Sequence, residues 1–501
     1  RQGGNAVDAA VAMAFALGVV DPSNNGLGGF GGFMVIFLAK SQQVVTIDYN
    51  TVAPLEARLD SFPLLPDGLV ANDLNRMGYM AISVPGVLAG LAMALATYGT
   101  RKLEGVLEPA IDLAEKGFEA SPILACALKE PHLAQFPETA KIFDGEHGTL
   151  LRLPDYAQTL RIIAEEGPRA FYEGKLAQAI VSHIKEDGGL LSLKDLAGYR
   201  PRILSSDRGR YRGCEIFTPG ACSGGPFIYE TLNILEGFDL AGLQPYGPES
   251  LHLIVEAMKL GWADRLRLFG DPDFAPVPPE EVTSKEHGQR LRAKINPAKA
   301  LRGLGISDPF GCWSRGSTTH LSVVDEGRNM VALTQTLGPL WFGSGITIPG
   351  TGLVMNNGMA LFDPRPGKPN SIAPRKRPLT NMTPTLVIKG GYPFLTLGTP
   401  GGRRIPTMVT NFLIGVIDYR LSIHEAITAP RFHCEVDEPV LVEEAVSSEV
   451  QQALRDKGHE VCFLSLSDFY GPASGIMVDP ITGNLHGGAD PRPFSGAIAG
   501  Y

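Results

Sequence analysis

Two hydroxyl-rich segments that follow one another, residues 317–325 (STTHLSVVD) and 330–336 (MVALTQT), constrain the fold of this chain most strongly. Each reads as a β-strand, and the first carries small hydroxyl side chains where a core strand would normally begin. The four residues between them (EGRN) are typical of a turn. The two segments are therefore predicted to pair as an antiparallel hairpin.

The register of this hairpin depends on its loop. With a tight loop at Gly327-Arg328, Thr318 pairs opposite Leu337. Thr319 then pairs opposite Thr336. Threonines from two strands would then meet at one end of a sheet, which indicates a functional site.

The rest of the chain alternates helical blocks with strands, and residues 276–317, rich in Pro, Gly and charge, are the best linker candidate. Helices are predicted at residues 5–20, 252–268, 411–419 and 424–429, with another opened by Val84-Pro85-Gly86 and running through Tyr98. Strands are predicted at residues 33–39, 44–48, 214–218, 385–389 and 394–397. Antiparallel hairpins combined with helical blocks predict an α+β fold, with sheets covered by helices.

The glycine-rich stretch Gly26–Gly31 matches G-x-G-x-x-G, the pattern of a dinucleotide-binding loop. That motif must follow a strand and open a helix. Here the predicted order is helix, glycine loop, strand. We therefore expect a turn in which the backbone passes very close to another segment.

Composition excludes several classes of protein. The 501 residues, 44% apolar and 19% charged, describe a globular chain that is neither disordered nor membrane-embedded. A net charge of −9 without a dense basic cluster predicts no nucleic-acid partner. The longest apolar run, residues 9–20, is shorter than the roughly 20 residues of a membrane helix. The chain begins with Arg1, so we expect the natural N-terminus to be missing, and the compartment cannot be read from this sequence.

Six scattered cysteines form no C-x-x-C pair and have no histidine at zinc-finger spacing. They are predicted to be free thiols, because a domain of this size needs no disulfide framework. No H-E-x-x-H motif or carboxylate cluster indicates a metal, and no cofactor is expected.

The hydroxyls of the hairpin allow one kind of catalysis more readily than others. The chain has no G-x-S-x-G elbow, and His320 would point to the opposite face of its strand from Thr319, which favours a structural histidine. A threonine can instead act as nucleophile if its own α-amino group is free and serves as base. That chemistry requires cleavage of the chain directly before Thr318. The residues alone leave this as one alternative beside an ordinary strand.

The sequence resembles the γ-glutamyltransferases (glutathione hydrolases), a family of N-terminal-nucleophile hydrolases. The resemblance spans nearly the whole chain and is carried by many motifs in order. They are Gly3–Ala10, the loop Gly26–Gly32, Val84-Pro85-Gly86, Phe171–Gly174, Ala263-Asp264-Arg265, Gly270-Asp271-Pro272, Thr318–Asp325, Gly398–Gly402 and Asp490-Pro491-Arg492.

The resemblance implies an αββα four-layer sandwich and a precursor that cuts itself between Ser317 and Thr318. Residues 1–317 would form a large subunit and residues 318–501 a small one, intertwined in a single structural domain. Thr318 would then be the nucleophile, and Thr336 holds the position of the family's supporting threonine. Gly401 and Gly402 fall on the family's oxyanion hole, where two backbone N–H groups reach a tetrahedral intermediate.

Several substrate-binding positions depart from the family pattern. The arginine that holds the substrate α-carboxylate is replaced by Asn50, and the paired serines by Thr380-Asn381. Residues that bind the α-amino group are replaced by Gly338, Gly358 and Leu361. Arg403 is a possible substitute charge, although a surface arginine is the more ordinary interpretation.

Three functions remain open at this point. The first is hydrolysis or transfer of γ-glutamyl groups from a small amide such as glutathione. The second, favoured by the lost ammonium-binding residues, is hydrolysis of another small acid amide of glutaryl or oxamate type, since an unpaired substrate charge in a closed site is costly. The third, from another class, is a non-catalytic binding protein.

Overall fold

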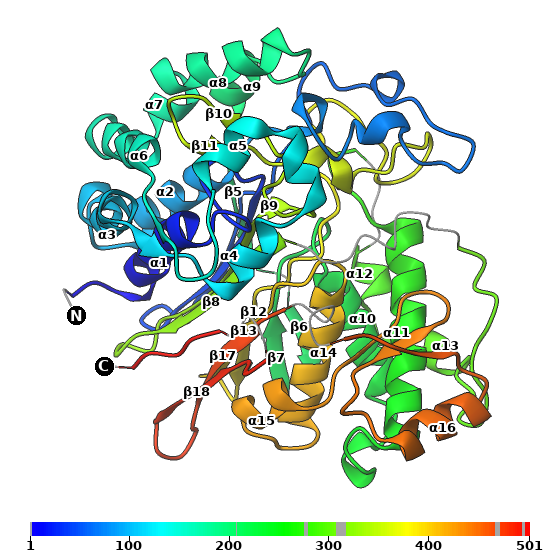
Figure 1. Cartoon of the computed structure of the whole chain (residues 1–501). Coiled ribbons are helices and arrows are strands. Elements are labelled where there is room, and N and C mark those ends of the chain that lie inside the picture. The colour runs from blue at the N-terminus through cyan, green and yellow to red at the C-terminus, as the bar shows by residue number, and fades with distance from the viewer. Residues whose placement is uncertain are drawn as a thin grey trace.

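Two β-sheets lie face to face in the middle of the molecule, and each combines strands from both sides of residue 318 (Figure 1). The computed structural model describes residues 3–206, 208–274, 279–306, 317–465, 471–492 and 496–500. The first sheet has the order β5 (Arg202–Ser205), β2 (Gln43–Asp48), β1 (Gly31–Leu38), β9 (Met330–Gly338) and β8 (Ser317–Val324). The second has the order β18 (Leu485–Ala489), β17 (Ser474–Val478), β13 (Tyr392–Gly398), β12 (Thr385–Lys389), β7 (Cys214–Phe217) and β6 (Arg208–Tyr211).

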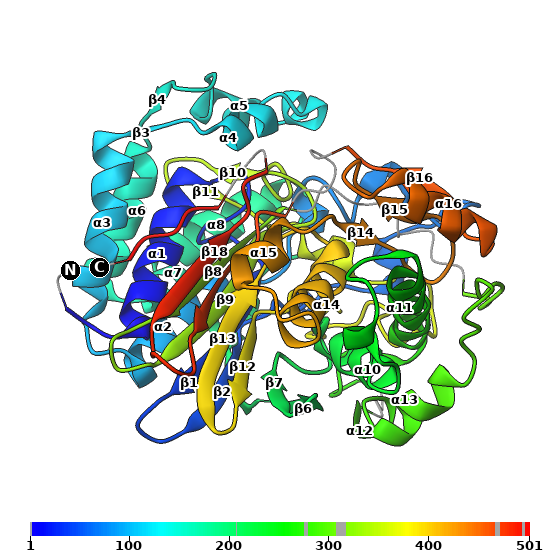
Figure 2. The same cartoon turned by 90° about the horizontal axis from the view of Figure 1, so that it is seen from below.

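Helices cover the outer face of each sheet, as the view from below shows (Figure 2). Against the first sheet lie α1 (Ala6–Val20) and α2 (Val87–Tyr98), with α3 (Leu103–Lys116) and α6 (Pro154–Glu166) beside them. Against the second lie α10 (Gly225–Leu235), α11 (Pro248–Leu268), α14 (Arg404–Ile417) and α15 (Ile423–Thr428). The predicted αββα four-layer sandwich is confirmed.

Most of the remaining helices and strands are short. The helices are α4 (Pro122–Ala127), α5 (Pro137–Ile142), α7 (Arg169–Tyr172), α8 (Lys175–Glu186), α9 (Leu193–Gly198), α12 (Pro279–Val282), α13 (Lys285–Arg292) and α16 (Ser448–Asp456). The strands are β3 (Phe118–Glu119), β4 (Leu150–Leu151), β10 (Thr347–Ile348), β11 (Leu353–Val354), β14 (Phe432–His433), β15 (Val440–Val442) and β16 (Val461–Phe463). Among the described residues, no helix combines the length and the apolar character that a bilayer crossing requires.

The side-chain alternation of β1 explains why both faces of the first sheet are buried. Met34 and Ile36 belong to the core beneath α1 and α2, whereas Val35 and Phe37 belong to the layer between the sheets. Successive strand residues point to opposite faces, so a strand covered on both sides is apolar throughout. This arrangement fixes β1, and with it the neighbouring β9, at the centre of the molecule.

The hairpin of β8 and β9 forms as predicted, but its predicted register is wrong by one residue. Thr319 lies opposite Gln335 rather than Thr336, because the loop has three residues instead of two. Arg328 closes this loop in the left-handed conformation, with φ 64°. An irregularity between Ser317 and Thr319 shifts the pairing back, so that Ser317 faces Gly338 and Thr318 falls within a bulge.

The glycine loop before β1 serves close packing, as expected. A Cβ atom on Gly31 would lie 1.9 Å from the carbonyl oxygen of Tyr49, and one on Gly28 would lie 2.2 Å from that of Val354. The loop also leads into a strand rather than a helix. The dinucleotide interpretation is therefore wrong for this loop.

The predicted linker is more structured than expected, because α12 and α13 both lie within residues 276–317. Residues 307–316 of this segment lie outside the described residues. Five cysteines are free thiols, as predicted, and Cys312 lies outside the described residues.

Candidate active site

A cavity of about 610 Å³ opens where β8 and β9 end, next to the segment that joins β13 to α14. This volume is typical of a small-molecule site. The structure brings nine of the residues singled out from the sequence to its wall. They are Ser317, Thr318, Thr336, Gly338, Leu361, Thr380, Asn381, Gly402 and Arg403.

Two hydroxyl groups meet at one peptide carbonyl in this cavity. The side chains of Thr318 and Thr336 both donate a hydrogen bond to the carbonyl oxygen of Ser317. The Thr336 hydroxyl is held in place by the backbone N–H of Gly338, whose nitrogen lies 2.8 Å from Oγ1. Thr318 and Thr336 are 4% and 3% exposed, so this carbonyl is polarised away from bulk water.

Asp21 lies behind the hairpin and was not singled out from the sequence. Its carboxylate accepts a hydrogen bond of 3.1 Å from the Thr319 hydroxyl and one of 2.7 Å from the Asn24 side chain. Removal from water raises the pKa of Asp21 to about 7, against the opposing effect of these bonds. Asp21, whose pKa lies near neutral pH, thus contacts Thr319, the residue that follows Thr318.

Gly401 and Gly402 lie between β13 and α14 with φ values of 133° and 59°. Their carbonyl groups accept the first backbone bonds of α14, from Arg404 and Ile405. Within the described part of the chain, neither of their N–H groups has a hydrogen-bond acceptor. Two backbone donors at a helix N-terminus are therefore available to an anionic group.

The wall of the cavity is strongly cationic although the whole chain is acidic. It carries six cationic side chains and two carboxylates, and these are Arg76, Arg265, Arg267, Arg365, Lys368 and Arg403 against Asp73 and Asp363. The two carboxylates already form ion pairs, with Arg76 and Arg365. Such a wall raises the local concentration of anionic substrates.

Arg403 is not the surface arginine that its ordinary interpretation predicts. Its guanidinium lies 2.7 Å from the Glu435 carboxylate and 5.7 Å from the centroid of the Trp262 ring. Burial raises the pKa of Glu435, but Arg403 and His433 together outweigh this effect and hold the pKa at about 2. Arg403 is thus a cavity residue whose charge is largely matched by Glu435.

Two predicted substrate-binding residues do not line the cavity. Asn50 is 0% exposed, and its side-chain nitrogen lies 3.0 Å from the carbonyl oxygen of Pro378. Gly358 is buried against Ser83, whose hydroxyl oxygen would lie 2.0 Å from an added Cβ atom. Both residues are packed behind the wall rather than within it.

The cavity wall lacks polar side chains at two of the positions where the resemblance predicts binding of the substrate α-amino group. Gly338 has φ 141°, and a Cβ atom there would lie 1.8 Å from the Asn357 side-chain oxygen. No side chain fits at this position without displacing Asn357. Leu361 lines the cavity with an apolar side chain.

His320 is structural, as its position on the strand predicts. It lies between the two sheets, with Nδ1 2.8 Å from the Thr334 hydroxyl and Nε2 3.1 Å from that of Ser322. Burial lowers its pKa to about 3, so the ring is neutral. Thr319 points the other way, toward Asp21.

Arg265 is the cavity residue that sequence reasoning missed. It entered the sequence comparison only as part of the motif Ala263-Asp264-Arg265. Its guanidinium donates to the carbonyl oxygens of Ser223 and Thr380, and to the Asn381 side-chain oxygen at 3.0 Å. An arginine on a helix that is buried along most of its length was the available signal.

Comparison with known proteins supports a single family. Residues 1–500 match the family described as Gamma-glutamyltranspeptidase. The chain is 37% identical to the glutathione hydrolase proenzyme of Escherichia coli (strain K12), covering 100% of this chain and 89% of that protein. It is 40% identical to the Acylase ACY 1 proenzyme of Pseudomonas sp. (strain SE83), covering 92% and 83%.

Solved structures agree. The crystal structure of cephalosporin acylase from Bacillus halodurans superimposes with a TM-score of 0.89 and 29% identity, covering 100% of this chain and 92% of that one. Its αββα architecture is the N-terminal-nucleophile hydrolase fold. This chain belongs to the gamma-glutamyltranspeptidase family, and it is an enzyme of that family.

Proposed function

We propose that this chain cuts itself between Ser317 and Thr318 and then uses Thr318 as the N-terminal nucleophile of an amidohydrolase. The observation that carries this proposal is the meeting of the Thr318 and Thr336 hydroxyls at the carbonyl of Ser317. One hydroxyl belongs to the residue whose amide bond would be cut. The other is placed to stabilise the oxygen of the same carbonyl.

Self-cleavage proceeds by transfer of an acyl group from nitrogen to oxygen. The Thr318 Oγ attacks the carbonyl carbon of Ser317, the carbon–nitrogen bond breaks, and the hydroxyl proton passes to the nitrogen that leaves. The Thr336 hydroxyl stabilises the intermediate oxyanion. Water then hydrolyses the ester, leaving a carboxylate on Ser317 and a free α-amine on Thr318.

The same atoms serve the mature enzyme. The freed α-amine, with an ordinary pKa of about 8, accepts the proton of the Thr318 hydroxyl as Oγ attacks a substrate amide. The N–H groups of Gly401 and Gly402 bind the oxyanion, and the Thr336 hydroxyl supports the nucleophile. The leaving amine takes the proton, and water or an acceptor amine then releases the acyl group from Thr318.

The fragments 1–317 and 318–501 remain one folded body after the cut. In the first sheet, β1 from the large fragment pairs with β9 from the small one. In the second sheet, β7 from the large fragment pairs with β12 from the small one. Separating the fragments would break both sheets, so cleavage alone does not release either of them.

The preferred acyl donor is a small acid amide without an α-ammonium group, such as a glutaryl amide. Gly338 and Leu361 remove the polar side chains that would bind an ammonium, and the wall is otherwise cationic. A substrate ammonium would therefore be repelled by the cationic wall and would be buried without a counter-ion. Similarity to an acylase and to a cephalosporin acylase supports the same preference.

A γ-glutamyl donor is the second candidate. Thr380 and Asn381 keep hydrogen-bonding side chains on the cavity wall, at the positions of the family's paired serines. Similarity to the Escherichia coli glutathione hydrolase proenzyme also favours it. The two candidates share the nucleophile and differ only in the donor.

Denaturing electrophoresis and a substrate panel test the proposal. The purified chain is expected to show two bands, cut at Ser317–Thr318, whereas Thr318→Ala stays a single band and Thr318→Ser is still cut. The panel contains glutaryl p-nitroanilide, γ-glutamyl p-nitroanilide and oxamate, and the glutaryl compound is expected to react fastest. A single uncut band from folded wild-type protein would rule out catalysis by Thr318 and leave a binding protein. Turnover of the γ-glutamyl compound alone would overturn the donor preference.

A further inference from the structure

We propose that Arg265 selects acyl donors that carry a carboxylate, through its charge and through its hold on Thr380 and Asn381. This inference rests on the proposed function, because it assigns the specificity of the same cavity. Arg265 reaches the cavity from α11 and is 1% exposed. It is one of the largest fully buried side chains of the described chain.

The charge of Arg265 has no carboxylate partner within ion-pair distance in the described chain. Its printed partners are two carbonyl oxygens and the Asn381 amide oxygen, all of them neutral. Burial and the nearby charge of Arg403 lower the pKa of Arg265 to about 9, so it remains cationic at neutral pH. A buried cation without a counter-ion is costly, and a substrate carboxylate removes that cost on binding.

Arg265 and Arg403 lie on the same side of the cavity, around one aromatic ring. Each guanidinium carbon is 5.7 Å from the centroid of the Trp262 ring. Because Glu435 pairs with Arg403, the two guanidinium groups and this carboxylate leave one net positive charge. Arg265 rather than Arg403 therefore carries the charge that remains for a ligand.

The contacts of Arg265 also place hydrogen-bonding groups beside this charge. Arg265 binds the Thr380 carbonyl and the Asn381 side-chain oxygen, and so holds the backbone of Thr380 and the side chain of Asn381 in place. The Thr380 hydroxyl is buried and has no hydrogen-bond partner among the residues that the structure describes. A carboxylate bound here would meet a cation and an unused hydroxyl, whereas Asn50 is packed behind the wall.

Matched substrates test this inference. Arg265→Gln is expected to lower kcat/KM for glutaryl p-nitroanilide by about 10- to 100-fold, the usual value of a charge-assisted contact. For the analogue whose terminal carboxylate is a primary amide, the loss should stay below about 3-fold. Arg290→Gln is the control, because Arg290 is an exposed arginine on α13 that does not line the cavity. An equal loss for both substrates would show a purely structural role and overturn the proposal.

Self-cleavage and thermal unfolding separate this inference from the proposed function. If wild type is neither cut nor active on any amide, the proposed function fails before Arg265 is tested. If Arg265→Gln does not fold, inhibition of the wild-type enzyme by free ligands still tests the carboxylate site. Free glutarate should inhibit turnover at concentrations at which glutaramide does not. Equal inhibition by glutarate and glutaramide would contradict a carboxylate site.

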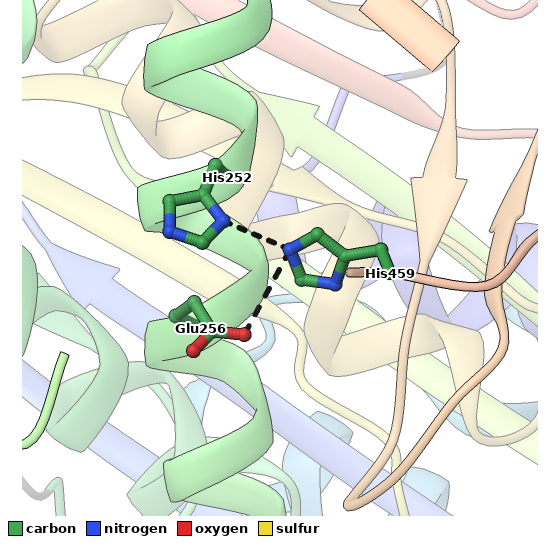
Figure 3. A group of neighbouring side chains, drawn as sticks. All are labelled: His252, Glu256 and His459. Carbon is green, nitrogen blue, oxygen red and sulfur yellow. Dashed lines mark hydrogen bonds and ion pairs between the residues drawn. The ribbon is translucent and has the colours of Figure 1, made fainter. Parts of the chain in front are cut away.

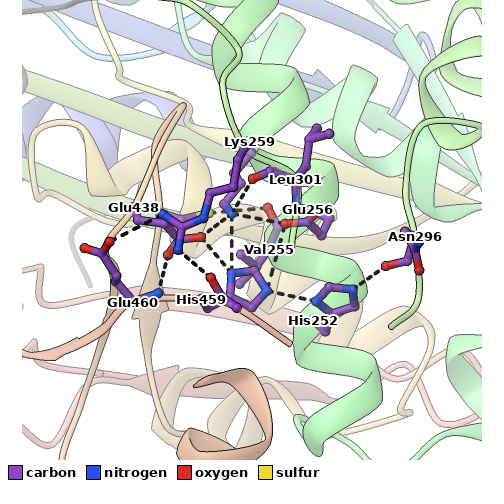
Figure 4. Close-up of polar contacts among 12 residues, drawn as sticks. His252, Val255, Glu256, Lys259, Asn296, Leu301, Glu438, His459 and Glu460 are labelled. Atoms are coloured by element: carbon purple, nitrogen blue, oxygen red, sulfur yellow. Dashed lines mark hydrogen bonds and ion pairs between the residues drawn. The ribbon is translucent and has the colours of Figure 1, made fainter. Parts of the chain in front are cut away.

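A second observation, far from this argument, concerns a buried cluster that joins α11 to the C-terminal half of the chain. Figure 3 shows His252 and Glu256 on successive turns of α11, with His459 facing them from another segment. Figure 4 adds the ammonium of Lys259 and the carboxylate of Glu438. All five residues are buried: His252 is 0% exposed, and the side chains of the other four are at most 3% exposed.

The hydrogen bonds of the two histidines require one proton more than two neutral rings possess. His252 Nε2 lies 2.8 Å from the Asn296 carbonyl oxygen, and His459 Nδ1 lies 2.9 Å from the Glu438 carboxylate. Both partners are acceptors, so both nitrogens carry protons. The ammonium of Lys259 also lies 3.3 Å from His459 Nδ1, but the carboxylate oxygen is the closer neighbour. The inner nitrogens, His252 Nδ1 and His459 Nε2, are 2.8 Å apart and need a third proton between them. His459 lies 2.9 Å from the Glu438 carboxylate and 3.9 Å from that of Glu256, whereas the outer nitrogen of His252 faces a neutral carbonyl, so the extra proton belongs to His459.

The extra proton also balances the charge of the cluster. Lys259 lies 3.1 Å from Glu256 and contacts Glu438, so one ammonium faces two carboxylates. A cationic His459 makes the sum neutral. Other polar groups around the cluster have their own partners or lie at its edge, and they are Cys434, bonded to the Val255 carbonyl, Arg302, paired with Glu460, and Lys457, bonded to the Pro297 carbonyl.

We infer that this neutral cluster, completed by a cationic His459, clasps the two fragments together after cleavage. His252, Glu256 and Lys259 belong to the large fragment, as do Asn296 and Leu301, which bond to the cluster through their backbones. Glu438 and His459 belong to the small fragment. Removing one member leaves buried charge unpaired, which is more damaging than loss of a surface ion pair.

Nitrogen-15 NMR of histidine-labelled, cleaved protein tests the clasp. At pH 7.5 both ring nitrogens of His459 should be protonated, with the signal assigned by comparison with His459→Gln. The same variant should release the small fragment at a lower urea concentration than wild type, whereas His486→Gln on the exposed β18 should not. A neutral His459 or an unchanged release midpoint would overturn the inference. So would one divalent metal ion per chain that chelators remove, because the ion would then replace the shared proton.

Discussion

The hydroxyl group of Thr336 donates to the carbonyl oxygen of Ser317, a residue 19 positions earlier in the chain. The bulge at Thr318 and the three-residue loop of the hairpin together produce this contact. If this bond stabilises the oxyanion of self-cleavage, Thr336→Val should slow the appearance of the two fragments by about 100-fold, the usual loss for one oxyanion donor.

The matched control is Thr336→Ser, which keeps the hydroxyl and should be cut within a few-fold of the wild-type rate. The rate is measured by electrophoresis from the moment of synthesis in a cell-free system. Wild-type cleavage by Thr336→Val would show that the contact has no part in the reaction.

Gly402 and Gly390 form a matched pair for testing the oxyanion site. Their φ values are 59° and 60°, but Gly402 lines the cavity and Gly390 lies in the turn between β12 and β13. Alanine at either position should cost about 1 kcal/mol of stability, because the left-handed conformation disfavours a Cβ atom. Only Gly402→Ala should also lower kcat, by about 10-fold or more. Equal kcat values for the two variants at saturating substrate would remove Gly402 from the oxyanion site.

Leu361 offers a direct test of whether the cavity lacks a group that binds the α-ammonium of a γ-glutamyl donor. Leu361→Asp places a carboxylate on the cavity wall and should raise the ratio of γ-glutamyl to glutaryl turnover by about 10-fold, through one charge-assisted contact. Leu361→Asn has nearly the same shape without the charge and should change the ratio much less. An unchanged ratio in Leu361→Asp would mean that this side chain does not face the α-amino position of the donor.

Asp21 should make stability depend on pH in a definite direction. Its folded pKa of about 7 exceeds the ordinary value of 3.8, so the folded protein holds the proton more tightly than the unfolded chain. Stability therefore falls as the pH rises from about 4 to about 7, and the full cost persists above that. Asp21→Asn should be more stable than wild type by roughly 1–3 kcal/mol at pH 8, with no difference near pH 4.

Thermal unfolding in a Thr318→Ala background, where the chain stays intact, measures this difference. Comparing the two proteins at each pH cancels the contributions of all other titrating groups. A stability gap that widens toward acid pH would contradict the raised pKa of Asp21.

Elements whose pattern is local were predictable from the sequence. The helix propensity of residues 5–20 and the long helical segment 252–268 identified α1 and α11, and the glycine loop before β1 was recognised as a packing turn. The motifs around Thr318 and Gly401-Gly402 pointed to one cavity wall, and Thr318 and Gly402 do share it. These predictions hold because spacing along a strand, helix or turn directly determines local geometry.

What required the tertiary structure was every feature that depends on contacts between distant segments. Arg328 adopts a left-handed conformation that lengthens the hairpin loop and shifts the register, and an arginine in the sequence does not predict this conformation. Asn50 turns away from the cavity to bind Pro378, while Arg265 reaches it from α11. The sequence by itself determined that a threonine hairpin and a glycine turn would be present. Only tertiary packing decided that the charge of Arg265 lies in the same cavity, because burial and electrostatic pairing depend on neighbours that folding brings together.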